Sequence, residues 1–99
     1  MTTSSIVEEP HHVMIDSLPD PRLRVQGTLI LDIARDGDFY VASCDQFDEY
    51  GYGPDQNVAV QDACNSIIEL YWELRENQDR LGPDMERTWQ ALSARIYAT

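Results

Sequence analysis

The stretch LILDIARDGDFYVASCDQFDEYGYGPDQNVAVQDACNSIIELY, residues 29–71, decides the fold of this chain. Apolar residues alternate with other residues from Val25 to Arg35, a pattern that is typical of a strand. Asp36-Gly37 comes next, and such a pair tolerates the positive φ that tight hairpin turns require. Alternation resumes over Phe39–Cys44. The sequence therefore predicts an antiparallel hairpin.

A third strand and a long helix are expected after this hairpin. Asp45–Glu49 reads as an acidic loop, and Tyr50–Gly53 as a short third strand. Asp55 is suited to cap a helix that we predict from Gln56 to Arg80. Apolar residues recur on one face of that helix at helical spacing. The pattern predicts an α+β fold, in which the helix covers a three-stranded antiparallel sheet.

The N-terminal residues 1–22 read as an appended segment. The segment begins with polar residues, and three prolines interrupt regular structure: Pro10, Pro19 and Pro21. We expect it to be mobile, or to dock on the body of the protein or on a neighbouring subunit. His11 and His12 are interpreted as part of a disordered tail rather than as metal ligands.

Residues 23–99 are expected to form a single α+β domain. Gly82-Pro83 is predicted to end the long helix, with Gly82 at the C′ position. A second helix is predicted over residues 83–97, with an apolar stripe that includes Trp89 and Leu92.

The charge of the chain is strongly negative. There are 18 Asp and Glu residues against seven basic residues, all of them Arg, which gives a formal net charge of -11. Such a chain repels phosphate backbones, so we expect no direct binding of nucleic acid. It attracts a basic protein partner. An acidic protein that is merely soluble fits the charge equally well.

The two cysteines, Cys44 and Cys64, do not make a disulfide framework, and we expect both to be reduced. Cys64 falls on the core face of the long helix and is expected to be inert. Cys44 stands beside Asp45, whose charge would raise the thiol pKa. No secretory signal or membrane-spanning run is visible, so we expect a cytoplasmic protein without membrane association.

Residues 25–74 resemble the HicB-like antitoxins. The resemblance rests on the second strand Phe39–Cys44, the loop from Asp45 to Gly51, the following Gly53, and a helix that carries Ala59 in its first turn. The loop departs from the family because Cys44 replaces its first proline and the second proline is also missing. No C-terminal DNA-binding module is recognisable.

The resemblance implies a partial RNase H-like fold of β-β-β-α order and a non-enzymatic role as an antitoxin. A HicB-like antitoxin binds and masks a small basic RNA-cleaving toxin of the HicA type. We expect the acidic loop to provide the contacts, through Asp45, Asp48, Glu49 and Tyr50. The alternative is that this loop is only solvated.

Self-association is a second expectation, as a dimer or a tetramer. Ile68, Trp72 and Trp89 are candidates for an interface between subunits, where aromatic residues are enriched. The other possibility is that Trp72 packs against Trp89 or Met85 within one chain. An orphan homo-oligomeric scaffold or regulator with the same fold is therefore the alternative function.

A metal-dependent nuclease is the least favoured hypothesis. Such enzymes need several carboxylates around metal ions, and Asp32, Asp45 and Glu69 are the best candidates. The helical pattern places Glu69 on the polar outward face, which argues against a shared site. We therefore expect no catalytic residues, no bound metal and no cofactor.

Overall fold

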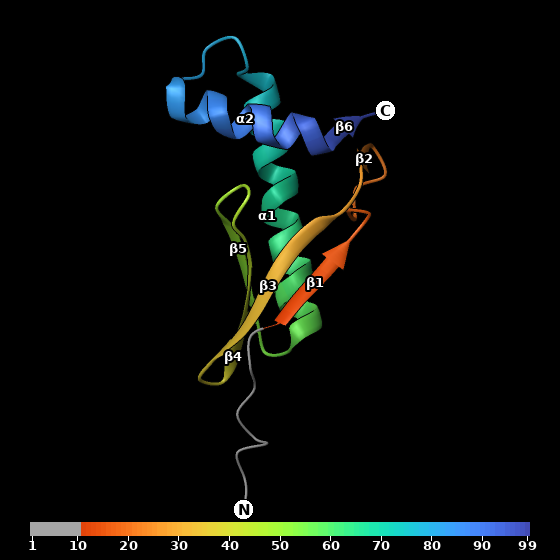
Figure 1. Cartoon of the computed structure of the whole chain (residues 1–99), viewed down its shortest axis with the longest axis vertical. Coiled ribbons are helices and arrows are strands. Elements are labelled where there is room, and N and C mark those ends of the chain that lie inside the picture. Colours follow the sequence, from red (N-terminus) through yellow and green to blue (C-terminus); the bar gives the residue numbers. More distant parts are fainter. Residues whose placement is uncertain (1–10) are drawn as a thin grey trace, which may run out of the picture.

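The computed structural model of the protein describes residues 11–99 (Figure 1). Within this range the chain forms a four-stranded sheet, a two-stranded sheet and two helices. The elements, in chain order, are β1 (His11–Ile15), β2 (Leu23–Val25), β3 (Leu29–Asp36), β4 (Phe39–Cys44), β5 (Glu49–Gly53), α1 (Gln56–Glu76), α2 (Pro83–Arg95) and β6 (Ile96–Ala98).

The α+β class is confirmed: an antiparallel sheet packs against the long helix α1, and a second helix follows. The predicted hairpin is β3–β4, in which Asp36 is paired with Phe39. Gly37 at the turn has a φ of 63°, the left-handed conformation that glycine adopts readily. Leu31 and Ile33 of β3 are buried, as alternation along a strand requires.

The larger sheet has one strand more than the three that the sequence predicts. Its order is β1-β3-β4-β5, and β1 pairs with β3 so that Val13 lies opposite Leu31. The expectation of a disordered tail at His11 and His12 is therefore wrong, because both residues belong to β1. Leu18, just after β1, is buried in the core. The part of segment 1–22 that precedes residue 11 lies outside the described residues.

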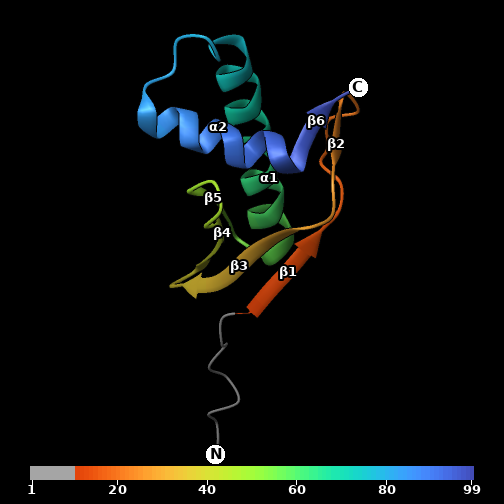
Figure 2. The ribbon, with the colours of Figure 1, turned by 45° about the horizontal axis from the view of Figure 1, so that its top comes forward.

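The predicted strand from Val25 to Arg35 is divided in two. Gly27, with a φ of 82°, separates β2 from β3. β2 turns away and pairs with β6, with Val25 opposite Ile96 (Figure 2). The second helix, predicted to reach residue 97, ends at Arg95. The chain continues as β6, and its first residue, Ile96, is fully buried.

Helix α1 begins as predicted and ends earlier than predicted. The Asp55 carboxylate accepts a hydrogen bond from the backbone N–H of Val58 at 2.9 Å, which confirms the N-cap. The helix ends at Glu76, and the backbone N–H of Asn77 donates to the Leu74 carbonyl. Gly82 is the N-cap of α2 and not the C′ residue of α1.

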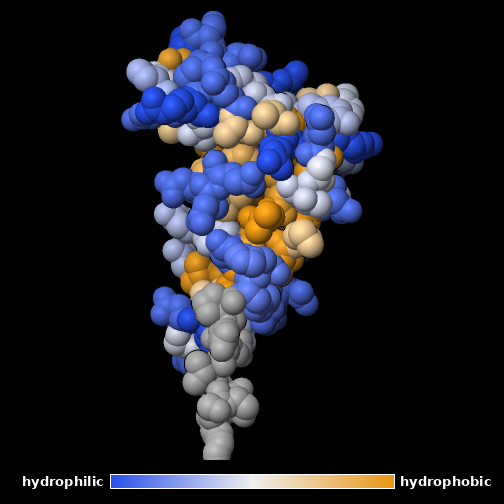
Figure 3. All heavy atoms as spheres, in the orientation of Figure 1, coloured by the Kyte–Doolittle hydropathy of each residue, from blue (hydrophilic) through white to orange (hydrophobic). Residues whose placement is uncertain are grey.

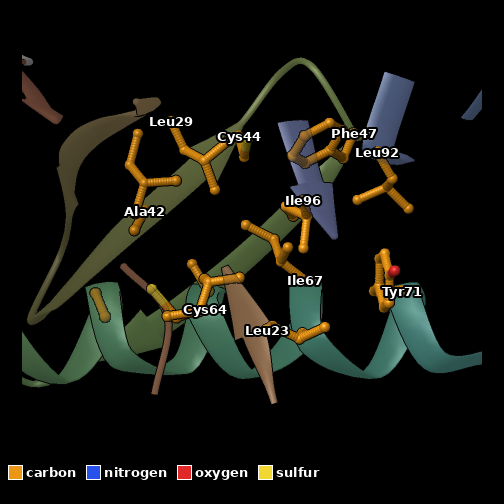
Figure 4. Close-up of a cluster of buried hydrophobic side chains, with 14 of the residues drawn as sticks. Leu23, Leu29, Ala42, Cys44, Phe47, Cys64, Ile67, Tyr71, Leu92 and Ile96 are labelled. Carbon is orange, nitrogen blue, oxygen red and sulfur yellow. The ribbon is translucent and has the colours of Figure 1, made fainter. Parts of the chain in front are cut away.

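A single hydrophobic cluster joins both sheets to both helices. Figure 4 shows Ile67 and Tyr71 of α1 on one side of this cluster, with Leu92 and Ile96 facing them from the C-terminal part of the chain. Phe47 is also buried, although it lies in the acidic loop. Its side chain anchors the loop, and its backbone N–H donates to the Cys44 carbonyl at 3.3 Å.

Two glycines of β5 let α1 lie directly against this strand. A Cβ atom on Gly51 would collide with the backbone of Ala59 and Ala63, and one on Gly53 would lie 2.7 Å from the backbone nitrogen of Ala59. The backbone N–H of Tyr52 donates to the Asp62 carboxylate of α1 at 3.0 Å. Glycine is required here because the helix and the strand approach each other backbone to backbone.

Candidate functional site

The side of the four-stranded sheet that faces away from α1 is the candidate binding surface. We call it the outer face. Strand alternation assigns to it His12, Met14, Ile30, Asp32, Ala34, Asp36, Phe39, Val41, Ser43, Tyr50 and Tyr52. None of these side chains is buried, and Met14 and Tyr52 are 71% and 57% exposed. Figure 3 shows hydrophobic atoms in the middle of the view, where β1 and β3 lie in front of α1.

One row of polar residues crosses all four strands of the outer face. The register places His12 opposite Asp32, Asp32 opposite Ser43, and Ser43 opposite Tyr50. His12 Nδ1 and Asp32 Oδ1 are hydrogen-bonded. In a catalytic triad the histidine lies between the serine and the carboxylate. Here the carboxylate lies in the middle, so His12 is not positioned to take a proton from Ser43.

The end of the acidic loop brings Asp48 and Tyr50 together. Asp48 has a φ of 56°, and the Tyr50 hydroxyl donates to its Oδ1 at 3.2 Å. The charge of Asp48 and this hydrogen bond raise the pKa of Tyr50. A carboxylate and an exposed aromatic ring therefore stand side by side at the β5 end of the outer face.

The other two predicted contact residues, Glu49 and Asp45, are placed differently from this pair. Glu49 is half-buried, and its pKa is raised by burial and by the charges of Asp48, Glu69 and Glu73. Its side chain thus lies toward α1 rather than on the outer face. Asp45 is exposed at the start of the loop. Partner binding by these residues stays a prediction.

The carboxylates proposed for a nuclease site lie on different sides of the sheet. Asp32 belongs to the outer face beside His12, whereas Glu69 lies near Glu49 on the side of α1. Over residues 11–99, no group of three or more His, Cys, Asp or Glu residues is placed to hold a metal ion. The geometry offers no support for a shared metal site.

The predicted interface residues make contacts within the chain. Ile68, Trp72 and Trp89 are half-buried against the hydrophobic core. Both tryptophans contact Tyr71, each with ring centroids 5.3 Å apart from the tyrosine ring. Tyr71 therefore packs against both indoles. A role for these residues between subunits stays a prediction.

A buried carboxylate that the sequence did not single out fixes Trp72. Asp20 accepts hydrogen bonds from the Trp72 Nε1 and from the Arg22 side chain and backbone N–H. These bonds, chiefly those from the Arg22 side chain and Trp72, hold the pKa of Asp20 well below its ordinary value. The Arg22 and Arg75 guanidinium carbons lie 4.5 Å and 5.3 Å from the centre of the Trp72 ring. Asp20 stands between Pro19 and Pro21, a pattern that indicates a loop, so nothing in the sequence suggested a buried carboxylate there.

The outer face is acidic as well as aromatic. Its strands contribute two carboxylates, Asp32 and Asp36, and Asp48 adds a third at the edge, whereas no arginine belongs to the outer face as defined. Two of the arginines, Arg22 and Arg75, stack on Trp72 instead. The exposed aromatic rings are therefore set in a surface that attracts cations and repels phosphates.

Neither helix between residues 11 and 99 is long and apolar enough to cross a membrane. No protein-family model, no curated protein and no solved structure matches the chain. The HicB-like resemblance therefore rests on the motifs of residues 25–74 alone.

Proposed function

We propose that the protein is a non-enzymatic binding module, whose outer face binds a small basic protein in the cytoplasm. The observation that carries this proposal is the exposure of Tyr50 and Tyr52 beside Asp48 on an uncovered sheet. Following the HicB-like resemblance, the partner is an RNA-cleaving toxin of the HicA type, and the protein acts as its antitoxin.

The aromatic residues supply the contact area in this proposal. Phe39, Tyr50 and Tyr52 are each at least half exposed. Tyrosine is enriched among the residues that dominate binding energy, because a rigid ring excludes water over a large area. The hydroxyl of Tyr50 is already held by Asp48, which orients the ring before a partner binds.

The carboxylates supply steering and selectivity. A protein that cleaves RNA needs a basic surface to hold phosphates. The outer face offers carboxylates and aromatic rings in place of phosphates and bases, so it competes with RNA for that basic surface. The net charge of -11 extends the attraction beyond the contact itself. Masking the RNA-binding surface is sufficient to inhibit such a toxin, without any catalysis.

The proposal is tested with a small basic HicA-like protein, whose gene is to be sought next to the gene of this protein. Co-expression is expected to yield a complex that survives purification at moderate salt. Added protein is expected to stop RNA cleavage by the isolated toxin at an equimolar ratio. Cleavage that continues with the protein in excess, together with no co-purification, would exclude the antitoxin role. The orphan scaffold or regulator would then be the remaining alternative.

A further inference from the structure

The two edges of the four-stranded sheet differ in how far the rest of the chain covers them. At the β5 edge, Gly51 and Gly53 let α1 approach, and the Tyr52 N–H is bonded to Asp62 of the helix. At the other edge, β1 pairs only with β3 among the strands of residues 11–99. The β1 edge therefore keeps a free side on which another strand can pair.

β1 also lacks the residues that usually prevent such pairing. Natural edge strands are protected by proline, by lysine or other charged residues, or by a bulge. The strand reads His-His-Val-Met-Ile and contains neither proline nor any Asp, Glu, Lys or Arg. All five residues pair with β3 in continuous register, so no bulge interrupts it.

A groove of about 490 Å³ runs between β1 and the first half of α1. It exists because α1 lies against β5 and β4, at the far side of the sheet from β1. Val13, Ile15, Leu18 and Val60 give it an apolar lining, and Gln56 and Gln61 border it. A strand added to the β1 edge would place every second side chain in this groove.

We propose that a second copy of the chain occupies this site, by antiparallel pairing of β1 with β1. The strand fits its own groove, because Val13 and Ile15 of each copy are apolar and lie on the groove side, where His11 is hydrogen-bonded to Gln56 at the border of the groove. His12 and Met14 of each copy then lie where the outer faces of the two copies meet. The interface is isologous, as in most homodimers, so each copy fills the groove of the other.

The charge of β1 itself does not oppose self-association at this edge. Two chains of net charge -11 repel each other, and close contact is least costly where carboxylates are absent. β1 contains no carboxylate and carries two histidines. Pairing would create a continuous eight-stranded sheet, with the Tyr50 and Tyr52 patches at its two ends. Such a dimer forms whether or not a basic partner binds.

The mass in solution, measured by light scattering on the full chain, tests the proposal. We expect a species of twice 11.3 kDa at micromolar concentration. Val60→Glu puts a charge in the groove and is expected to give a monomer. Tyr97→Glu on the exposed side of β6 adds the same charge and is expected to leave the dimer intact. Circular dichroism is used to check that each variant is folded.

Cysteine cross-linking tests the location independently. Cys44 is buried, but Cys64 lines the groove together with Val13, so each variant is made in a Cys64→Ala background, in which an introduced cysteine reports on its own neighbours. One of His12→Cys, Val13→Cys and Met14→Cys is expected to form a linked dimer on mild oxidation, whereas Tyr97→Cys is not. A monomeric wild-type chain would overturn the proposal. So would a dimer that persists in Val60→Glu but dissociates in Ile68→Glu, since that result places the interface on α1 and α2.

Discussion

The indole Nε1 of Trp72 lies 3.0 Å from Oδ2 of Asp20, and this hydrogen bond joins segments that are 52 residues apart in sequence. It attaches the loop after β1 to the second half of α1. Arg22 completes the arrangement, since its guanidinium bonds the same carboxylate and stacks on the Trp72 ring. One ionised carboxylate therefore holds the loop after β1 to α1, in addition to the hydrogen bond between His11 of β1 and Gln56 of α1.

The stability of the protein is expected to fall in acid because of Asp20. Its pKa is lowered in the folded state, so the fold favours the ionised form. This contribution is complete above the ordinary pKa of 3.8 and is lost as the pH falls toward the lower folded value. Asp20→Asn is predicted to be less stable at neutral pH and to lose less stability between about pH 5 and about pH 2. Urea denaturation at several pH values measures this.

Asp84→Asn is the matched control for this substitution. Asp84 pairs with Arg87 on α2, and both side chains are highly exposed. Exposed pairs of this kind contribute less than about 1 kcal/mol. An acid dependence that is the same in wild type and in Asp20→Asn would show that Asp20 does not carry the effect.

Gly51→Ala is predicted to destabilise the fold severely. The added methyl group would collide with the backbone of α1 at Ala59 and Ala63, and neither backbone can move without displacing the helix. Overpacking against rigid atoms costs about 3 kcal/mol or more. The free energy of unfolding, from chemical denaturation, is the measurement.

Gly82→Ala is the control for the glycine substitution. A Cβ atom at Gly82 would meet no atom within 4 Å, and the backbone there has a φ of -74°, which any residue can adopt. The expected loss is below about 1 kcal/mol, the scale of a weakened N-cap. Equal losses in the two variants would contradict the close approach of β5 and α1.

Both cysteines are predicted to react slowly in the native protein. Burial raises the pKa of the Cys64 thiol and also that of Cys44, where the charges of Asp45 and Asp32 add to the effect. Alkylation needs the thiolate and access to it. Labelling by iodoacetamide is expected to be at least about tenfold slower in buffer than in urea. Rapid labelling of either thiol in buffer would contradict its burial.

Much of the fold could be predicted because local signals agreed with each other. Asp36-Gly37 marked the β3–β4 turn, and Asp55 marked the start of α1, since turn and cap chemistry depend on adjacent residues. β1 was missed because the prolines around it, Pro10, Pro19 and Pro21, indicated an irregular segment, and because its partner strand begins 14 residues after β1 ends. β6 has only three residues and directly continues a helical pattern, so alternation could not reveal it.

The candidate site could be predicted only in part, because the side of the sheet on which a residue lies is not visible from its type. Asp48 and Tyr50 stood out as charge beside an aromatic residue, and the structure places them in contact. Glu49 looks like an equal candidate in the sequence, because it is also acidic and stands between Asp48 and Tyr50. In the structure the pleat of β5 turns its side chain to the other side of the sheet. Tyr52 was missed as a candidate, although alternation from Tyr50 places it on the same face.

Binding of a HicA-like protein is predicted to weaken as salt rises. The attraction depends on carboxylates at the protein surface, such as Asp32 and Asp48, which ions screen. Raising the ionic strength from about 0.05 M to about 0.5 M is expected to lower the association rate by about tenfold or more. Stopped-flow or surface plasmon resonance kinetics measure this rate. A constant association rate over that range would contradict electrostatic steering.

Calorimetric titration of a HicA-like protein into Tyr52→Ala and Tyr97→Ala shows whether a partner binds through the outer face. Both tyrosines are on strands and about half exposed, but only Tyr52 belongs to the outer face. We expect Tyr52→Ala to weaken the affinity by about 30-fold, the scale of a binding hot spot, and Tyr97→Ala to change it by less than about threefold. Wild-type affinity for Tyr52→Ala, or equal losses in both variants, would contradict binding through the outer face.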